Sequence, residues 1–379
     1  MNYSKFSTFT SQTKGRVFLE KPDKHRTCFM RDRDRIIHCA AFRKLKYKTQ
    51  VFVYHEGDYY RTRLSHSIEV SQLARSISKI FKVNDDLAEA ISLAHDVGHT
   101  PFGHAGEEAL NSKLHKIGGF NHNFQALKIL TLLEKKYFGF DGLNLSWETL
   151  EGILKHNGPV KEKIPSYIYK FVNFFEGDLR LNASFEGQIA SISDDIAYNN
   201  NDIDDGLHAE LFTMEELENV TLVKESLKKI KIKNFRNDNY KLRHELVRLL
   251  INTMINDLVS NTKINLLHLK PKDVFDIIRI KKNIVSFSDD MIHKEEELRT
   301  FLKKKMYNHI TVKTMTFKAK KIVLELFDLF VEEFQLLPKV WRTFETKREL
   351  MLNVADYISG LTDKNAISIH NKFFNLYNI

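Results

Sequence analysis

The sequence predicts an all-α protein in which a helical core carries additional C-terminal helices. Its 379 residues include only 6 prolines and 15 glycines, and no stretch rich in Pro, Gly or Ser marks a linker. Because these residues interrupt helices, their scarcity beside long segments of helical periodicity favours helices throughout. The length allows one large domain or two small ones. We expect a single domain with a helical appendage.

Apolar residues recur at steps of three to five over residues 64–80, which aligns them along one face of a helix. Asn84 or Asp85 can cap a second helix that runs up to His95. A loop with two glycines and a proline follows, and another helix starts at about His104. Residues 1–60 carry a dense charged run and no assigned helix. Further helices are expected at 121–137, 147–156 and 186–203, in succession over 206–341, and at 347–377.

The composition, 42% hydrophobic and 28% charged, is ordinary for a water-soluble protein. Cys28 and Cys39 are too few for a disulfide framework and suggest a reducing cytoplasm. The N-terminus lacks the apolar segment and cleavage site of a signal peptide. The apolar segment 322–337 is interrupted by acidic residues, which is typical of an amphipathic helix rather than a membrane span. We therefore expect a cytoplasmic protein without a membrane partner.

The formal net charge of +9 is compatible with nucleic acid, acidic lipid or phosphorylated small molecules as partners. The basic residues are spread over nearly the whole chain, however. Clusters at 228–236 and 303–305 fit solvated helix faces better than a binding surface. Weak nucleic-acid binding is therefore a secondary expectation.

Two imidazoles and two carboxylates form a candidate metal site. His66 lies within one predicted helix, His95 and Asp96 end the next, and Asp194 lies much later in the chain. Such a mixed nitrogen and oxygen set suits Mn, Fe, Co, Ni or Mg better than a thiolate-selecting zinc site. It leaves coordination positions for water and a phosphate oxygen, which metal-assisted hydrolysis requires.

A His-Asp dipeptide alone is weak support for a metal site, since it occurs by chance in many chains. The context strengthens it. Segment 93–110, LAHDVGHTPFGHAGEEAL, places three histidines, an Asp and two Glu around a glycine-rich turn. Arg63 precedes His66 by three residues and so shares its helix face. Because unpaired buried ionisable groups are costly, this density of charge favours a functional site over a structural core.

Asp194, Tyr198 and Asp202 are spaced i, i+4 and i+8, which stacks them on one helix face. A metal ligand, a flat aromatic ring and a second carboxylate would then project into one cavity. The same spacing fits a helix with a buried Tyr and acids near its end. Spacing alone does not distinguish the two interpretations.

Motifs over much of the chain carry a resemblance to a known family. They are RDRDRIIHCAAFRKLKYKTQVF (31–52), GDYYRTRLSHSIEVSQLARSI (57–77), LAEAISLAHDVGHTPFGHAGEEALN (87–111), GGFNHNFQALKIL (118–130), GLNLSWETLEGILKHNGP (142–159), SISDDIAYNNNDIDDGL (191–207) and DYISGLTD (356–363). Together they resemble the bacterial deoxyguanosine-triphosphate triphosphohydrolases and their dGTPase-like relatives in the HD superfamily. Segment 206–340 matches only diffusely.

The resemblance implies an all-α HD-domain fold over residues 1–379. Its metal-binding core would span about 60–210, the helical appendage about 211–345, and C-terminal helices 346–379 would pack back on the core. The implied reaction is hydrolysis of a dNTP, dGTP or several dNTPs, at the α-phosphorus to deoxynucleoside and triphosphate. Members are commonly oligomers with effector sites, so the resemblance also implies a homo-oligomer and a dNTP effector.

The resemblance assigns the metal ligands as His66, His95, Asp96 and Asp194, for a divalent ion such as Mn, Mg, Fe or Co. Asp194 is chosen over Asp195 because the family's ligand precedes the sugar-packing Tyr by four positions.

The resemblance also assigns the groups that act on the phosphates. His104 and Glu107 match the family's catalytic pair, in which an imidazole moves a proton at the scissile P–O bond while a carboxylate orients it. Whether His104 activates water or protonates the leaving 5′-oxygen stays open. His122 resembles another active-site His near the phosphates, and His99 is expected to serve similarly. Arg63 resembles the Arg that neutralises phosphate charge.

The sugar is the second feature that the resemblance addresses. Gln50 and Asp202 resemble groups that bond the 3′-hydroxyl, and Tyr198 the ring that crowds C2′ and disfavours a ribonucleotide. Tyr357 is expected near the base or phosphates. The matched segments also contain His38, Arg43 and His156, for which packing or capping roles fit equally well.

Two alternatives stay open. Another HD phosphohydrolase, such as a nucleotidase or phosphodiesterase, would share the metal ligands but has no need of the HTPFGHAGEE turn with GGFNHN downstream. A non-catalytic nucleotide sensor or nucleic-acid binder would usually tolerate loss of a ligand, yet every expected position is filled.

Overall fold

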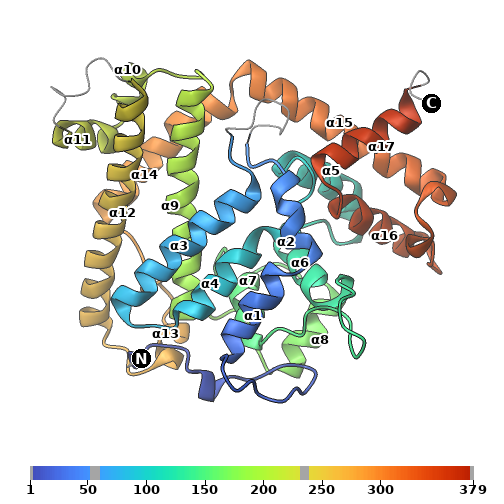
Figure 1. Ribbon diagram of the computed structural model, residues 1–379, viewed down its shortest axis with the longest axis horizontal. Helices are drawn as coiled ribbons and strands as arrows, with labels where there is room; N and C mark the ends of the chain where they lie inside the picture. Colours follow the sequence, from blue (N-terminus) through green and yellow to red (C-terminus); the bar gives the residue numbers. More distant parts are fainter. Residues whose placement is uncertain (1–2, 52–59, 231–238, 376–379) are drawn as a thin grey trace.

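A computed structural model describes residues 3–51, 60–230 and 239–375. Within these ranges the regular elements are helices, and the β contact is an isolated antiparallel bridge between Thr49 and Thr62 (Figure 1). The all-α prediction is therefore confirmed. No helix in the described part of the chain is both long and apolar enough to cross a membrane.

Three helices form the centre of the molecule: α3 (Arg63–Phe81), α4 (Asp85–Ala94) and α9 (Phe185–His208). They pack against one another (Figure 1). Thr62 and Ser65 form a capping box at the start of α3, and the Asn84 side chain caps α4 as predicted. The buried apolar face of α3 packs against that of α9 in one hydrophobic cluster. This packing fixes the positions of the candidate site residues on all three helices.

A second hydrophobic cluster lies on the other side of α4 and joins α1 (Cys28–Ile37), α6 (His122–Lys128), α7 (Trp147–Leu154) and α8 (Ser166–Phe174). The helix predicted at 121–137 is shorter than expected. It changes to a π-helical turn over Ile129–Leu133 and ends there, because Glu134 is extended. Helix α1 was not predicted.

The helices that follow α9, up to residue 302, extend the first hydrophobic cluster, to which α9 also contributes (Figure 1). They are α10 (Met214–Leu217), α11 (Thr221–Lys229), α12 (Asn239–Leu269), α13 (Val274–Arg279) and α14 (Asp289–Leu302). The residues expected to form an appendage thus share buried contacts with α3 and α9.

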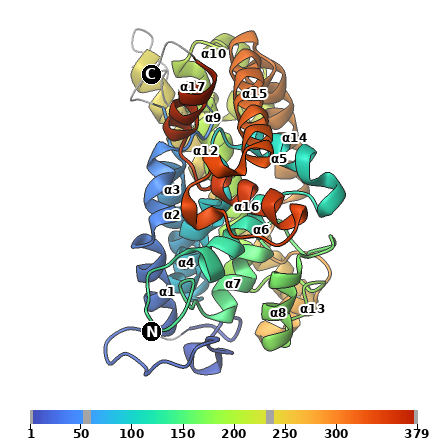
Figure 2. The same cartoon turned by 90° about the vertical axis from the view of Figure 1, so that its right-hand side faces the viewer.

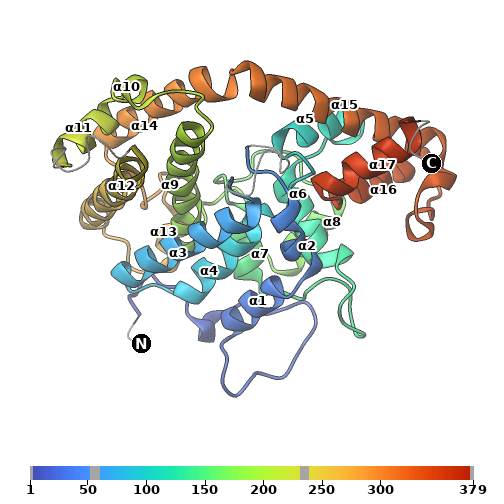
Figure 3. The same ribbon diagram turned by 45° about the horizontal axis from the view of Figure 1, so that its top comes forward.

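The C-terminal helices enclose the other end of the site region. Figure 3 shows α14 and α15 (Ile310–Glu332) running along one edge of the molecule, joined by a π-helical turn at Lys303–Tyr307. Helices α15 and α16 (Lys347–Ser359) pack on α5 (His104–Leu114), and α17 (Asp363–Phe374) packs on α15 (Figure 2). A third hydrophobic cluster unites these helices.

The remaining short elements connect these helices. They are α2 (Ala40–Lys44) and the 3₁₀ turns Thr10–Gln12, Leu45–Tyr47, His95–Gly98, His115–Ile117, Phe334–Leu336 and Lys339–Trp341.

Candidate active site

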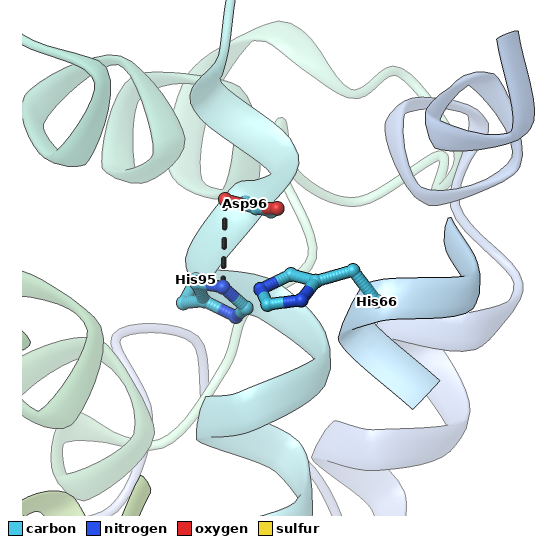
Figure 4. A group of neighbouring side chains, drawn as sticks. All are labelled: His66, His95 and Asp96. Carbon is cyan, nitrogen blue, oxygen red and sulfur yellow. Dashed lines mark ion pairs between the residues drawn. The ribbon is translucent and has the colours of Figure 1, made fainter. Parts of the chain in front are cut away.

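His66, His95 and Asp96 converge between α3 and the end of α4 (Figure 4). All three are buried, and their donor atoms lie within 4.8 Å of one another. Asp194, from α9, joins them: its Oδ1 lies 2.7 Å from His66 Nε2 and 3.6 Å from His95 Nε2. Segments far apart in the sequence thus bring two imidazoles and two carboxylates together.

The imidazole of His95 is oriented by the backbone. Its Nδ1–H donates to the Ser92 carbonyl at 2.6 Å, which leaves the lone pair on Nε2 directed toward the carboxylates. His95 Nε2 and Asp96 Oδ2 are buried without a hydrogen-bond partner among the described residues. Because buried polar atoms are normally satisfied, these two orphaned acceptors fit a site for a divalent cation.

Arg63 also contacts Asp96, with Nη1 3.0 Å from Asp96 Oδ1 and its side chain only 2% exposed. Burial alone would raise the pKa of Asp96, but the Arg63 guanidinium and the neighbouring imidazoles hold it well below its usual range. Asp96 is therefore a carboxylate, as a metal ligand must be.

The helix face that carries Asp194 distinguishes it from its neighbour. Asp195 points away from the histidines and pairs with Arg299 at 2.6 Å. The Asp195 side chain is 41% exposed, whereas that of Asp194 is 26% exposed. The structure therefore brings Asp194, and not Asp195, to His66 and His95.

A second cluster surrounds Glu107 on the first turn of α5. Glu107 Oε2 lies 3.3 Å from His104 Nδ1, and Oε1 accepts hydrogen bonds from both the backbone N–H and Nδ1 of His122 at 2.9 Å. Burial would raise the pKa of Glu107, but its bonds to the two imidazoles keep it well below its usual range. The His104 side chain is 63% exposed and so is open to a ligand, whereas Glu107 is held beneath it.

His99 connects the two clusters. Its Nδ1 lies 3.0 Å from Asp96 Oδ1, and its ring stacks on that of His122 with centres 4.0 Å apart. His99, Glu107 and His122 also lie within 4.8 Å of one another. The predicted metal ligands and the predicted catalytic pair thus form one continuous site.

The turn between the two clusters contains two consecutive residues in the left-handed region of backbone conformation. Phe102 and Gly103 both have positive φ, 62° and 57°. A Cβ on Gly103 would lie 2.7 Å from Nη2 at the end of the Arg63 side chain, so the positive φ, more than the space, favours glycine here. Phe102 tolerates its strained conformation because its ring is buried in the third hydrophobic cluster.

Tyr198 and Asp202 follow Asp194 on the same face of α9. The Tyr198 ring lies edge-on to His66, with centres 6.2 Å apart. The Tyr307 hydroxyl lies 2.9 Å from the Tyr198 hydroxyl and bonds to the Asp202 carboxylate. Burial raises the pKa of Asp202 to about 7. Tyr307 was missed in the sequence because it falls in the segment that matches the family only diffusely.

Gln50 and Tyr357 have no contact with the predicted metal ligands or with the Glu107 cluster among the hydrogen bonds, ion pairs and ring contacts of the described residues. Gln50 is buried, and its Oε1 has no hydrogen-bond partner among the described residues. The Tyr357 ring contacts those of Phe330 and Trp341, with centres 5.4 and 6.2 Å away, within the third hydrophobic cluster. The contact of Tyr357 with a nucleotide stays a prediction.

His156, for which the sequence left a packing or capping role equally open, lies at the metal cluster. It is buried, and its Nε2 lies 3.1 Å from Asp194 Oδ2. Its ring stacks on that of His95 with centres 4.9 Å apart and planes inclined by 21°. Its place in a matched segment was the one signal in the sequence.

This arrangement, a helical fold with His, His-Asp and Asp converging from three helices, defines an HD-domain phosphohydrolase. The HD domain family matches residues 63–199, and the phosphohydrolase-associated domain matches residues 285–372.

Curated relatives place the chain more narrowly. It is 46% identical to a deoxyguanosinetriphosphate triphosphohydrolase-like protein of Parvibaculum lavamentivorans, with 98% of this chain and 96% of the relative aligned. Proteins of the same description from Bartonella quintana and Roseobacter denitrificans are 45% and 44% identical; they cover 98% and 96% of this chain and 96% and 95% of their own length. The chain belongs to the deoxyguanosinetriphosphate triphosphohydrolase-like family.

Proposed function

We propose that this protein is a metal-dependent dNTP triphosphohydrolase that converts a dNTP and water to a deoxynucleoside and triphosphate. One observation carries the proposal: His99 joins the metal cluster to the Glu107 cluster, lying 3.0 Å from Asp96 and stacked on His122. A phosphorus atom between the two clusters would be reached both by the metal site and by an exposed imidazole. The names of the relatives support the substrate class.

The proposed metal ligands are His66, His95, Asp96 and Asp194, which suit Mn, Mg, Fe or Co. When bound, the ion would polarise a phosphate oxygen and lower the pKa of a bound water. Arg63, buried beside Asp96, would neutralise phosphate charge through its guanidinium fork.

His104 is the proposed proton-transfer group. Water oxygen bonds to the α-phosphorus, the bond to the 5′-oxygen breaks, and that oxygen gains a proton. The 3.3 Å contact with Glu107 orients the exposed His104 ring for this exchange. Glu107 also holds His122, so one carboxylate fixes two imidazoles toward the same phosphate region.

The proposed sugar site comprises Gln50, Tyr198 and Asp202. The Asp202 carboxylate and the Gln50 amide would bond the 3′-hydroxyl. The Tyr198 ring, beside His66, would crowd a 2′-hydroxyl. The hydroxyl of Tyr307 holds both Tyr198 and Asp202, which supports a rigid pocket wall here.

The test is incubation of the full chain with each dNTP, and with GTP, in the presence of Mn²⁺ or Mg²⁺, followed by quantification of nucleoside and phosphate products. The proposal predicts triphosphate and deoxynucleoside in equal amounts, loss of activity in EDTA, and poor use of GTP. In ¹⁸O-labelled water the label should enter triphosphate. Pyrophosphate or orthophosphate would identify another HD phosphohydrolase instead. Salt-sensitive DNA binding without hydrolysis of any dNTP would indicate a nucleic-acid binder.

Pairs of dNTPs in the same assay test the proposed effector. A second dNTP that raises turnover of the first, together with a sedimentation mass above 44.4 kDa, would support an effector-dependent homo-oligomer.

A further inference from the structure

His156 lies outside the residues assigned to metal, phosphate or sugar, yet it contacts two of the proposed ligands. It follows α7 in the chain and is 4% exposed. The end of α7 is anchored by Lys155, whose buried Nζ donates to Glu151 Oε1 at 2.7 Å and to the Asp178 carbonyl at 2.9 Å. The backbone that carries His156 is therefore held in place.

The two oxygens of Asp194 have different partners. Oδ1 faces His66 Nε2 at 2.7 Å and His95 Nε2 at 3.6 Å, whereas Oδ2 meets His156 Nε2 at 3.1 Å. A carboxylate with only one oxygen held can rotate about its Cβ–Cγ bond. His156 removes that freedom by holding the second oxygen, Oδ2.

The tautomer of His156 follows from its surroundings. Its Nδ1 is buried and has no hydrogen-bond partner among the described residues, whereas its Nε2 faces a carboxylate oxygen. A carboxylate accepts and does not donate, so the ring proton belongs on Nε2. The near-parallel stacking on His95 fixes the plane of the ring as well.

We propose that His156 is a positioning residue for the metal site: its Nε2–H holds Asp194 Oδ2 so that Oδ1 is presented to the cation that His66 and His95 bind. The proposal rests on the metal site of the proposed function but not on the identity of the substrate. Hydrogen bonds to ligating groups typically change metal affinity by 10- to 100-fold.

The experiment measures Mn²⁺ affinity of the full chain, by electron paramagnetic resonance titration without nucleotide. His156→Leu should bind Mn²⁺ about 10- to 100-fold more weakly than the wild type. His156→Gln, whose Nε2–H can reach the same oxygen, should restore affinity to within about threefold. His370→Leu is the matched control, because His370 also pairs with a carboxylate, Glu325 at 2.6 Å, far along the chain from the proposed ligands. It should bind Mn²⁺ as the wild type does.

Two results would overturn the proposal. Unchanged affinity in His156→Leu would show that Asp194 needs no such support. Loss of affinity in His156→Gln as large as in His66→Ala, with one fewer nitrogen coupled to Mn²⁺ in the electron spin-echo spectrum, would make His156 a direct ligand. Because these readouts need no dNTP, absence of dNTP hydrolysis would refute the proposed function and leave this test intact. Melting in EDTA separates a folding defect from a metal defect.

Discussion

Gly98 ends the 3₁₀ turn that carries His95 and Asp96, and it packs directly against the first turns of α6. A Cβ built on Gly98 would lie 2.0 Å from the His122 carbonyl oxygen and 2.3 Å from the Ala126 nitrogen. Real Cβ atoms essentially never approach other atoms within 3.0 Å. Both neighbours are backbone atoms, so no side-chain rotation can relieve the contact. Gly98→Ala should therefore displace α6 as a unit.

The size of the displacement follows from the distances. Ordinary contact begins at 3.4 Å, so the His122 carbonyl must retreat by more than an ångström from its 2.0 Å position. Overpacking of this kind typically destabilises a protein by about 1–3 kcal/mol. Because the neighbours are backbone atoms, we expect a loss of unfolding free energy of about 3 kcal/mol. The same movement draws His122 from Glu107, whose contacts are 2.9 Å long. Misplacement by about 1 Å can lower a rate by about 100-fold.

Two measurements check this prediction. Denaturant unfolding should show the loss of stability, and kcat/KM with the preferred dNTP should fall by about 100-fold. Gly139→Ala is the matched control, since a Cβ there meets nothing within 4 Å, and it should behave like the wild type. A Gly98→Ala protein with wild-type stability and a kcat/KM within about twofold of the wild type would refute the argument, because the packing would then accommodate the methyl group without moving His122.

Other positions test other parts of the site. His104→Ala should lower kcat by about 10²- to 10⁴-fold while Mn²⁺ still binds, and near-normal turnover would remove His104 from the chemistry. Asp194→Ala should lose Mn²⁺ binding in a titration, because the Asp194 carboxylate faces the histidines. Asp195→Ala should keep it, because Asp195 pairs with Arg299 instead. The reverse result would exchange their roles. Burial raises the Asp202 pKa from 3.8 to about 7, so between these pH values the folded chain keeps a proton that the unfolded chain loses. The wild type therefore loses stability as pH rises from about 4 to 7, whereas Asp202→Asn has no such group. Relative to the wild type, Asp202→Asn should gain up to about 4 kcal/mol over this range. Unfolding at several pH values measures this difference, and a constant difference would contradict it.

Sequence reasoning succeeded where the relevant distance runs along one helix or within one turn. The spacing of Asp194, Tyr198 and Asp202 predicted a common face, and α9 carries all three. The resemblance, rather than periodicity, assigned His104 and Glu107 as a pair, and their contact also spans one helical turn. Such relations follow from 3.6 residues per turn and need no knowledge of tertiary structure.

Helix α1 shows why periodicity failed elsewhere. The charged run RDRDR at 31–35 has no apolar stripe, so no helix was assigned there. In the fold its two buried charges have polar partners: Asp32 accepts from the Ser146 N–H at 3.0 Å, and Arg35 contacts Glu20 at 2.8 Å. These partners are distant in sequence. Without them, charged residues are expected to face solvent, because burying an unpaired charge is costly.

His156 and Tyr307 were undervalued for a related reason. Each acts through a partner on α9 that lies 38 or more residues away, and neither belongs to a local pattern with that partner. A histidine or tyrosine in isolation fits packing as well as function. Only the folded arrangement shows which oxygen or hydroxyl each one meets.

The C-terminal motif DYISGLTD gains a physical explanation from the same kind of contact. Asp363 Oδ1 accepts from the Phe102 N–H at 2.8 Å, and its Oδ2 accepts from the Thr49 N–H at 2.9 Å. Lys48, buried beside it, donates from Nζ to the carbonyls of His99 at 2.5 Å and Ser359 at 2.8 Å. The start of α17 and the end of α16 are therefore tied to both ends of the turn from His99 to Phe102.

That turn has a positive φ at Phe102, a conformation that costs energy in isolation and persists only where its surroundings fix it. The C-terminal helices supply much of that restraint through Asp363 and the third hydrophobic cluster, although they contribute none of the proposed metal ligands. Residues of the motif at 356–363 thus hold this turn in place, which gives the motif a structural role. The distance between His99 and Asp96, and with it the junction of the two clusters, depends on helices that the sequence places more than two hundred residues away.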